Sequence, residues 1–526
     1  MNTIGAGAFQ NCTALTGIYL PDSITFIGNN AFENCINATV LSLPANGGLA
    51  IIQDATFRNC TSLTTLTIPN GVQEIHQYAF EGCSNIEWVY TIPATVNFIG
   101  NYAFSGLRSD CWFVVENPNV SISKESFGTS GNIFGWINSS AQNYANAYAA
   151  INFYNIQTVR YVERCYLRIL NRVGEASGVM HWAKRMALSQ ETGVSIVHSF
   201  VFSTEFANRG LSDSQVVEIL YEAMLNRASD AAGKAFWMGF LDAGCSYDYV
   251  IHGFSEAPEF IDMCKNVYNI VPGTIALTQD RDQNVLVTAF VSRMYNLILN
   301  RKAEPAGLNT WTGHLNNRRM SGSQVVAGFI SSLEFKNRGL SDSDQVEIIY
   351  ETMLERASEP AGKAFWLAYL ADGMSAEAVV KGFSEAIEFR YLCSRYGINA
   401  APCTPSEYRD WNRQVTLFVI RLYQNALKHG ADTLGLNTWA GAMVTKASTP
   451  AKVAKDILTS LEAQMKLTSS ADFVDALYLS CLNRAPTIAE KSAGVTKLNA
   501  GTSREALVDQ ITGTAEFQNI VKGFGL

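Results

Sequence analysis

The nine residues Ile27-Gly28-Asn29-Asn30-Ala31-Phe32-Glu33-Asn34-Cys35 decide the fold of the N-terminal region, because their pattern recurs along the chain. An Ala-Phe or Thr-Phe pair closes five successive units, at Phe9, Phe32, Phe57, Phe80 and Phe104. The intervals are 23, 25, 23 and 24 residues. A unit this short cannot bury its own apolar face, whereas stacked units align equivalent side chains into columns. The spacing therefore predicts a solenoid with one coil per unit.

A cysteine follows the Phe by three residues in four of these units, at Cys12, Cys35, Cys60 and Cys83. Stacking would bring successive cysteines together, so disulfides between coils are one alternative. Free cysteine is among the most buried residue types, and an odd total of 11 leaves at least one thiol unpaired. We predict a second internal column made of buried thiols.

Each unit also contains a short apolar run, such as residues 63–69, that we predict to be the strand of its coil. Alternate residues of a strand face opposite sides. This places an exposed column at Tyr19, Ser42, Thr67 and Thr91, beside Val40, Thr65 and Tyr90. Rigid aromatic side chains are the strongest anchors for a partner, and a solvated face is the alternative. The predicted ligand-binding residues are Tyr19, Trp88, Tyr90 and Thr67.

The units resemble the leucine-rich repeats of BspA-like bacterial surface proteins, as in residues 27–35 and Leu66-Thr67-Ile68-Pro69. The resemblance continues through residues 116–120 and 139–145, and covers residues 1–157. It implies a β-rich α+β solenoid used for adhesion or ligand recognition. Because the first coil at Ile4 lacks the polar cap that solenoids need, we expect further sequence upstream, including a secretion signal.

A longer repeat with helical periodicity begins near residue 158. Its anchors are Tyr166, Tyr221, Tyr295, Tyr350, Tyr423 and Tyr478. The intervals of 55, 74, 55, 73 and 55 residues arrange six units as three pairs. We therefore predict three all-α domains, at residues 158–272, 285–400 and 411–526.

An Asn-Arg or related pair follows each predicted helix, and an acidic residue usually stands three positions after the arginine. The arginines are Arg172, Arg227, Arg301, Arg356 and Arg484. In Glu304-Pro305, the proline suits the first helical position and makes the acid a natural N-cap. We predict that the arginine satisfies carbonyl groups at the end of the preceding helix. Calcium binding is the alternative, but the loop offers few oxygen ligands.

A tryptophan stands four residues after a glycine in five of the units, at Trp182, Trp237, Trp311, Trp366 and Trp439. The sixth unit has Leu498 there, which indicates packing and not sugar stacking. We predict that Trp237 and Trp366 are buried in equivalent cores. The phenylalanines that follow a glutamate are interpreted in the same way: Phe206, Phe260, Phe335, Phe389 and Phe517.

This helical unit, with Ser203-Thr204-Glu205-Phe206 near its end, resembles the DUF4214 family, a domain of unknown function in bacterial secreted and S-layer proteins. The resemblance covers residues 160–522 and extends distantly to the linker domains of phycobilisomes. It implies attachment to envelope polysaccharide or a spacer role. Lys428-His429 and residues 485–487 depart from the pattern, which leaves the role of the last pair open.

Composition and motifs exclude several classes of protein. A net charge of -8, from 39 basic and 47 acidic residues, excludes a basic nucleic-acid binder. No run approaches the ~18 apolar residues of a membrane span. The six histidines form no His-Glu-x-x-His pair, and there is no Cys-x-x-Cys motif and no phosphate-binding glycine loop. We predict no catalytic residue, no metal site and no cofactor.

Taken together, these features predict a non-enzymatic, extracellular protein of the bacterial cell surface. Its solenoid would bind a host or neighbouring-cell protein or glycan, and its helical domains would bind envelope polysaccharide or act as spacers. A self-assembling surface-layer or filament subunit is the first alternative. The accessory region of a larger secreted carbohydrate-active enzyme is the second.

Overall fold

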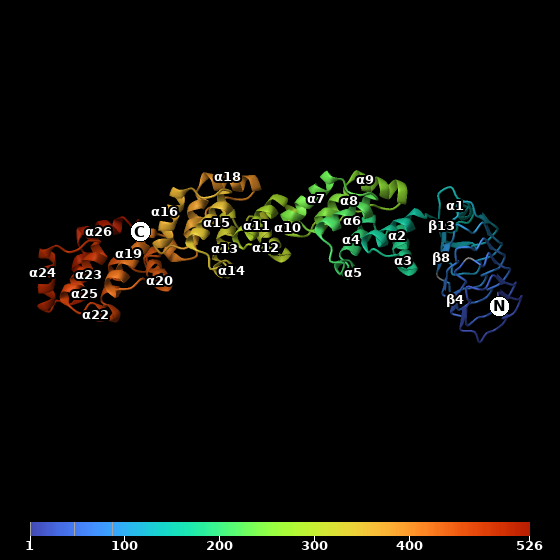
Figure 1. The fold of residues 1–526 in the computed structure, drawn as a ribbon, viewed down its shortest axis with the longest axis horizontal. Coiled ribbons are helices and arrows are strands. Elements are labelled where there is room, and N and C mark those ends of the chain that lie inside the picture. Colours follow the sequence, from blue (N-terminus) through green and yellow to red (C-terminus); the bar gives the residue numbers. More distant parts are fainter. Residues whose placement is uncertain (1, 47, 87, 526) are drawn as a thin grey trace. The chain divides into compact units, whose positions relative to one another are not determined.

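A computed structural model describes residues 2–46, 48–86 and 88–525, with only the backbone of residues 88–90. The chain forms two compact units. The first runs up to Leu241 and includes Tyr247–Leu277, and the second consists of Asp242–Ser246 and the residues from Thr278 onward. The first unit holds the strands and a set of helices, whereas the second is helical (Figure 1).

The strands of the first unit all pair in parallel and form the coils of a solenoid. One side consists of β2 (Gly17–Tyr19), β4 (Val40–Ser42), β6 (Thr65–Leu66), β8 (Trp88–Ile92), β10 (Trp112–Val115), β12 (Ser130–Gly135) and β13 (Ala150–Asn155). The other consists of β1 (Thr3–Ile4), β3 (Phe26–Ile27), β5 (Ile51–Ile52), β7 (Glu74–Ile75), β9 (Phe98–Ile99) and β11 (Ser121–Ile122). Helix α1 (Ser140–Asn146) lies between β12 and β13. The predicted solenoid is thus confirmed.

A continuous stack of phenylalanine rings forms the core of the solenoid. Successive ring centroids from Phe9 to Phe104 are 5.1, 5.5, 5.4 and 5.4 Å apart. Phe127 extends the stack, with its ring 5.7 Å from that of Phe104. The sequence prediction missed this sixth member because Ser-Phe stands there in place of Ala-Phe, although the interval is again 23 residues.

The cysteine column lies beside this stack. Cys35, Cys60 and Cys83 are buried, and all the cysteines are free thiols. Each of these three donates to the carbonyl of the Phe one coil earlier, at 3.2 Å. Burial raises the pKa of Cys60 to about 12, so the thiol stays protonated. The prediction of buried thiols is confirmed for these three, whereas Cys12 in the first coil is half-buried.

The first helical pair follows the solenoid in the first unit. Its elements are α2 (Gln157–Ile169), α3 (Ala176–Ala187), α4 (Gly193–Val201), α5 (Thr204–Ala207), α6 (Asp213–Leu225), α7 (Ala231–Ala243), α8 (Tyr247–Ser255), α9 (Pro258–Asp262) and a π-helix (Met263–Tyr268). None of the helices in the described part of the chain has the length and apolar character that crossing a membrane requires.

The second unit contains two further helical pairs. The first of them comprises α10 (Asp280–Gln283), α11 (Val285–Ile298), α12 (Pro305–Asn316), α13 (Gly322–Ser331), α14 (Leu333–Lys336), α15 (Asp342–Leu354), α16 (Pro360–Ala371), α17 (Ala376–Ser384) and α18 (Ile387–Tyr396). The other comprises a 3-10 helix (Tyr408–Asp410), α19 (Arg413–Leu422), a π-helix (Tyr423–Leu427), α20 (Thr433–Val444), α21 (Pro450–Leu458), α22 (Leu461–Lys466), α23 (Ser470–Leu482), α24 (Ile488–Asn499), α25 (Arg504–Thr512) and α26 (Ala515–Lys522). Each pair has its own hydrophobic core. The domain limits inferred from the sequence stay predictions.

The recurrent Asn of Asn-Arg stands where its helix ends. Asn226 has φ 53° and Asn483 has φ 57°, both in the left-handed region. Asparagine tolerates this conformation better than most residues, so it stops the helix and starts the turn. Glu355 and Lys428 adopt the same conformation in the units that depart from the pattern.

Candidate functional site

The outward face of the first coils is open to solvent. Tyr19 is 71% exposed and Val40 is 44% exposed, while Ser42, Thr65 and Thr67 are also exposed. The residues between them in the strands point inward, and β2 pairs with β4 so that Tyr19 stands opposite Ser42. Thus the predicted alternation is confirmed at these positions.

Two of the predicted ligand residues lie on β8, where the structure describes the backbone alone. Trp88 stands opposite Thr65 in the register of β6 and β8, and Tyr90 follows two residues later on the same strand. Their side chains lie outside the described residues. Thr91, which was expected in the exposed column, is half-buried.

The same strand face is covered at its other end by the first helical pair. Trp112, Val114 and Phe134 project from β10 and β12, and are 6%, 4% and 0% exposed. They share one hydrophobic cluster with residues of α2 and α3. The Trp112 ring stacks on Phe134 at 5.2 Å and on Tyr154 at 5.1 Å. The face that remains free is therefore the end formed by β2, β4 and β6.

In the helical pairs, the recurrent motif residues converge on one cluster, which we call the Arg clamp. Arg301 donates from Nε and Nη2 to the two carboxylate oxygens of Glu334, at 2.5 and 3.0 Å. It also pairs with Glu304, and its guanidinium lies 4.9 Å from the ring centroid of Tyr295. The equivalent clamps are built on Arg172, Arg227, Arg356 and Arg484. At the departing position, His429 bonds Glu462 at 2.9 Å instead.

The predicted role of these arginines at helix ends is wrong. Their planar guanidinium matches a carboxylate with two parallel hydrogen bonds, which is a stronger interaction than a bond to a neutral carbonyl. Other arginines fill the helix-end role, since Arg209 donates to the carbonyl of Ile169 and Arg338 to that of Ile298. The repeated Asn-Arg-Gly at residues 208–210 and 337–339 was the sequence signal for them.

The clamp arginines form ion pairs and hydrogen bonds with acidic residues that a calcium site would need as ligands. Hydrogen bonding to Arg301 lowers the pKa of Glu334 and of Glu304, and Arg172 does the same for Glu205. Glu304 occupies the predicted N-cap position of α12 without a side-chain cap bond, whereas Asp432 caps α20 through the Gly435 amide at 2.6 Å. Within residues 2–46, 48–86 and 88–525, no three His, Cys, Asp or Glu side chains are grouped so that they could hold a metal ion.

The recurrent tryptophans are half-buried, so the prediction that Trp237 and Trp366 are buried is wrong. Trp237 stacks on Phe254 at 5.1 Å and Trp366 on Phe383 at 5.2 Å. Their helices, α7 and α16, contain no buried residue. Each tryptophan ring therefore lies at the edge of its hydrophobic core. Trp182, Trp311 and Trp439 are also half-buried. The equivalence of the positions holds, but the expected degree of burial does not.

The glycine that stands four residues before the recurrent tryptophan packs against the hydroxyl of the anchor tyrosine, which leaves no room for a side chain. A Cβ atom at Gly233 would overlap the hydroxyl of Tyr221, and one at Gly362 would overlap that of Tyr350. Gly239, in the same helix as Gly233, has no atom within 4 Å of such a Cβ.

We expect Gly233→Ala to destabilise the first unit by about 1 to 3 kcal/mol, because the added methyl group displaces Tyr221. Gly239→Ala should instead stabilise it by up to about 1 kcal/mol, through the higher helix propensity of alanine. Thermal unfolding of both variants measures the difference. Equal shifts in the melting temperature of both variants would show that Tyr221 moves aside without loss of stability.

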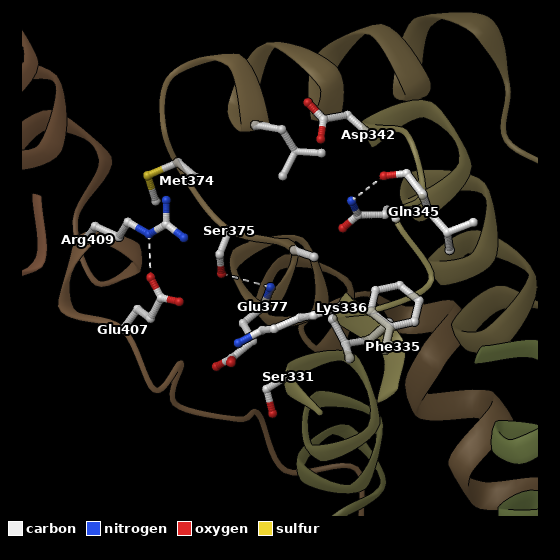
Figure 2. Close-up of a pocket in the computed structure, with 15 residues that line it drawn as sticks. Ser331, Phe335, Lys336, Asp342, Gln345, Met374, Ser375, Glu377, Glu407 and Arg409 are labelled. Atoms are coloured by element: carbon white, nitrogen blue, oxygen red, sulfur yellow. Dashed lines mark hydrogen bonds and ion pairs between the residues drawn. The ribbon is translucent and has the colours of Figure 1, made fainter. Parts of the chain in front are cut away.

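The second unit has a small cavity of about 270 Å³ between α13, α15 and α17 (Figure 2). Phe335 and Gln345 line it, together with Lys336, Glu377 and Arg409. This volume lies below the roughly 300 to 1,000 Å³ of ordinary ligand pockets. It therefore offers room for a small group only.

The equivalent pocket of the first helical pair has a less polar lining, with Ala207, Val216 and Tyr247 where the second unit has Lys336, Gln345 and Ala376. There Tyr247 donates its hydroxyl to Asp213 at 2.7 Å. In the second unit Ala376 is too short to do so, and Asp342, the counterpart of Asp213, lines the cavity (Figure 2). The two helical pairs thus differ at this position even though their clamps are alike.

Among the solved structures to which the chain is similar are leucine-rich repeat proteins. A leucine rich cell surface protein of Faecalibacterium prausnitzii A2-165 is 26% identical, with 27% of this chain and 32% of that chain covered and a TM-score of 0.21. A leucine-rich repeat protein of Bacteroides ovatus ATCC 8483 is 16% identical, with 29% and 52% covered and a TM-score of 0.21. The leucine rich repeat protein of T. pallidum is 21% identical, with 28% and 76% covered and a TM-score of 0.18. The chain therefore spans about a third to a half of the first two.

Family models match both the N-terminal region and the helical region of the chain. No curated protein matches the sequence. The BspA type leucine rich repeat region matches residues 1–111 in six copies. The domain of unknown function DUF4214 matches residues 139–209, 197–264, 277–339, 334–393 and 454–521. Together the two models suggest a bacterial surface protein. Because the DUF4214 matches cover more than half of its residues, the chain belongs to the DUF4214 family and carries a BspA type leucine rich repeat region at its N-terminal end.

Proposed function

We propose that this chain is a non-enzymatic, extracellular protein of the bacterial surface that recognises a protein or glycan on a host or neighbouring cell. The proposed site is the free end of the solenoid face, with Tyr19 and Thr67 joined by Trp88 and Tyr90 from β8. The observation that carries the proposal is the exposure of Tyr19, at 71%, beside the exposed Val40. A rigid aromatic next to an aliphatic side chain is a typical anchor for a partner.

The covered end of the same face supports this proposal. There, Trp112 and Phe134 already bind a helical partner within the chain. The strand face therefore packs against another surface at one end, and Tyr19 and Val40 at its free end are likewise aromatic and aliphatic.

For the helical pairs we propose a spacer or envelope-glycan-binding role. The residues that recur in every unit are used in the clamp and in the core, so they maintain the fold. A glycan would instead meet the side chains outside the motif, such as Phe236 and Phe365, which are 57% and 52% exposed. Aromatic rings at that exposure can stack on a sugar ring.

A binding screen of the full chain tests the proposed recognition. The chain is presented to panels of host extracellular proteins and of glycans from host and neighbouring cells. For the partner that binds, Tyr19→Ala should weaken the affinity by roughly 30-fold, as expected for an aromatic hot spot of about 2 kcal/mol.

Tyr391→Ala is the matched control, because Tyr391 is 68% exposed and lies in the helical second unit. It should leave the affinity unchanged. A chain that binds no member of the panels, or that binds equally well without Tyr19, contradicts the proposal. Concentration-dependent oligomers without such binding would favour the alternative of a self-assembling surface-layer subunit.

A further inference from the structure

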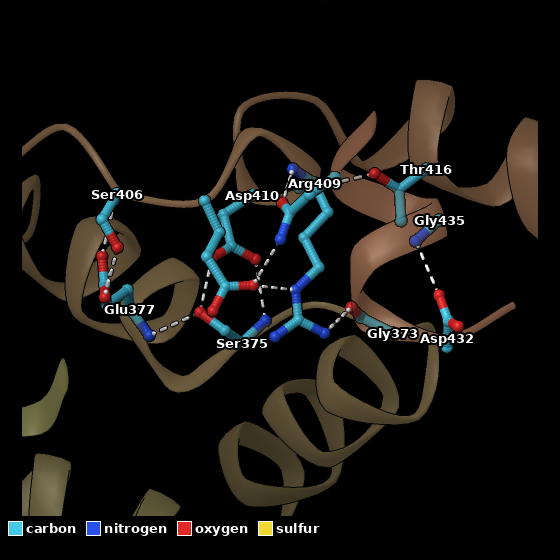
Figure 3. Close-up of polar contacts among 11 residues, drawn as sticks. Gly373, Ser375, Glu377, Ser406, Arg409, Asp410, Thr416, Asp432 and Gly435 are labelled. Atoms are coloured by element: carbon cyan, nitrogen blue, oxygen red, sulfur yellow. Dashed lines mark hydrogen bonds and ion pairs between the residues drawn. The ribbon is translucent and has the colours of Figure 1, made fainter. Parts of the chain in front are cut away.

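Two matching pairs of segments contact each other within the second unit. We call Gln279–Asn284 and Glu407–Asn412 the Arg-Asp leaders, and Gly244–Ser246 and Gly373–Ser375 the Gly-Ser turns. At the second joint, the carboxylate of Asp410 accepts from the Ser375 amide at 2.7 Å and from its hydroxyl (Figure 3). Arg409 donates to the Gly373 carbonyl at 2.8 Å. Each leader thus holds the turn that precedes it in the chain.

The first joint repeats this geometry atom for atom. Asp282 accepts from the amide and the hydroxyl of Ser246 at 2.8 and 2.6 Å, and Arg281 donates to the Gly244 carbonyl at 3.4 Å. Asp282 and Asp410 are 2% and 3% exposed. A buried carboxylate is tolerated only when its oxygens are hydrogen-bonded, so the serine of the turn is a required partner of the leader.

Each leader is also held by its own domain, which orients the aspartate before it meets a turn. The Arg409 amide donates to the Asn437 side chain at 3.2 Å. The Thr416 hydroxyl donates to the Arg409 carbonyl at 2.7 Å (Figure 3). Asn309 and Thr288 make the same bonds to Arg281. The leader is therefore a preformed recognition element.

The last helical pair carries a third Gly-Ser turn, Gly501–Ser503, with a similar backbone, and no leader contacts it among the described residues. Gly501 has φ 95°, close to the 104° of Gly244 and the 78° of Gly373, a region that favours glycine. Ser503 begins α25 as Ser375 begins α17. No described residue accepts a hydrogen bond from the Ser503 amide, and Ser503 is exposed to solvent.

The surroundings of the glycines show the same difference. A Cβ at Gly244 would meet Leu308 at 2.8 Å, and one at Gly373 would meet Leu436 at 3.2 Å, both from the pair that follows. At Gly501 nothing lies within 4 Å. Arg504 stands next to Ser503, where its guanidinium lies 4.8 Å from the Phe473 ring. Its Nη2 donates to the Leu467 carbonyl at 2.5 Å, so Arg504 is engaged within its own helical pair.

We propose that the Gly501–Ser503 turn is a docking site for the Arg-Asp leader of another helical domain of this kind. The aspartate binds the amide and hydroxyl of Ser503, and the arginine binds the Gly501 carbonyl. Both leaders in the described part of the chain are engaged at their own joints, so the partner is a further helical domain with a leader of its own. This inference goes beyond the recognition proposed for the solenoid and does not depend on it.

An extended chain tests the proposal, in which residues 399–526 are repeated directly after residue 526. The added aspartate then stands 35 residues after Ser503, as Asp410 stands 35 residues after Ser375. Hydrogen exchange is measured at the Ser503 amide in the natural and extended chains. We expect exchange at Ser503 to slow by about tenfold or more, as for a hydrogen bond to a charged acceptor.

Two controls sharpen this result. The Ser375 amide should stay protected in both chains, which shows that the existing joint is intact. Replacing only the added aspartate with alanine should return Ser503 to the exchange rate of the natural chain. If Ser503 exchanges equally fast in the natural and extended chains while Ser375 stays protected, the proposal is wrong, whatever the solenoid binds.

Discussion

Phe80→Ala should lower the free energy of unfolding of the solenoid by about 3 to 5 kcal/mol, the range for removing a core aromatic. The Phe80 ring is fully buried, and lies between those of Phe57 and Phe104 with centroid distances of 5.4 Å on both sides. A solenoid couples each coil to its neighbours, so a cavity in the middle weakens two interfaces at once. Urea denaturation, read by hydrogen exchange at β6 and β8, separates this loss from unfolding of the helices.

Phe9→Ala provides the matched control for this substitution. Phe9 is 40% exposed at the end of the stack and contacts a single ring of the stack, that of Phe32 at 5.1 Å. Its removal should cost about 1 kcal/mol, since less apolar area is buried there. Equal losses for the two variants would contradict a continuous ring stack as the source of stability.

Trp112→Ala should have a comparably large effect, about 3 to 5 kcal/mol, and should also change how the first unit unfolds. Trp112 is 6% exposed, stacks on Phe134 and Tyr154, and has the Lys184 ammonium 5.5 Å from its ring centroid. It therefore connects the solenoid to α3. Calorimetry should resolve the unfolding of the first unit into two transitions in the variant.

The control for this junction is Trp411→Ala, since Trp411 is 42% exposed and belongs to the second unit. It should leave the unfolding of the first unit unchanged. If Trp112→Ala unfolds in the same single transition with a loss below about 1 kcal/mol, the solenoid and the first helical pair are held together by other contacts.

The candidate site was only partly predictable from the sequence. Tyr19 and Thr67 were placed outward by strand alternation, and the structure has them exposed. That the same face is covered at Trp112 was not predictable, because the contact joins β10 to helices more than 40 residues later in the chain, as in the pairing of Arg160 with Glu116. Alternation decides which side of a strand a residue faces and leaves open what lies against that side.

The sequence by itself determined the repeat lengths, the internal Phe and Cys columns and the helix ends at residues such as Asn226. These features depend on local stereochemistry and on a repeat period shared by adjacent coils. Both can be recognised from the sequence alone. The tertiary structure alone decided that Arg301 binds Glu334, that Trp237 lies at a rim and that Asp410 joins two helical pairs. Each of these depends on side chains brought together from separate helices, so their partners follow from packing and not from spacing.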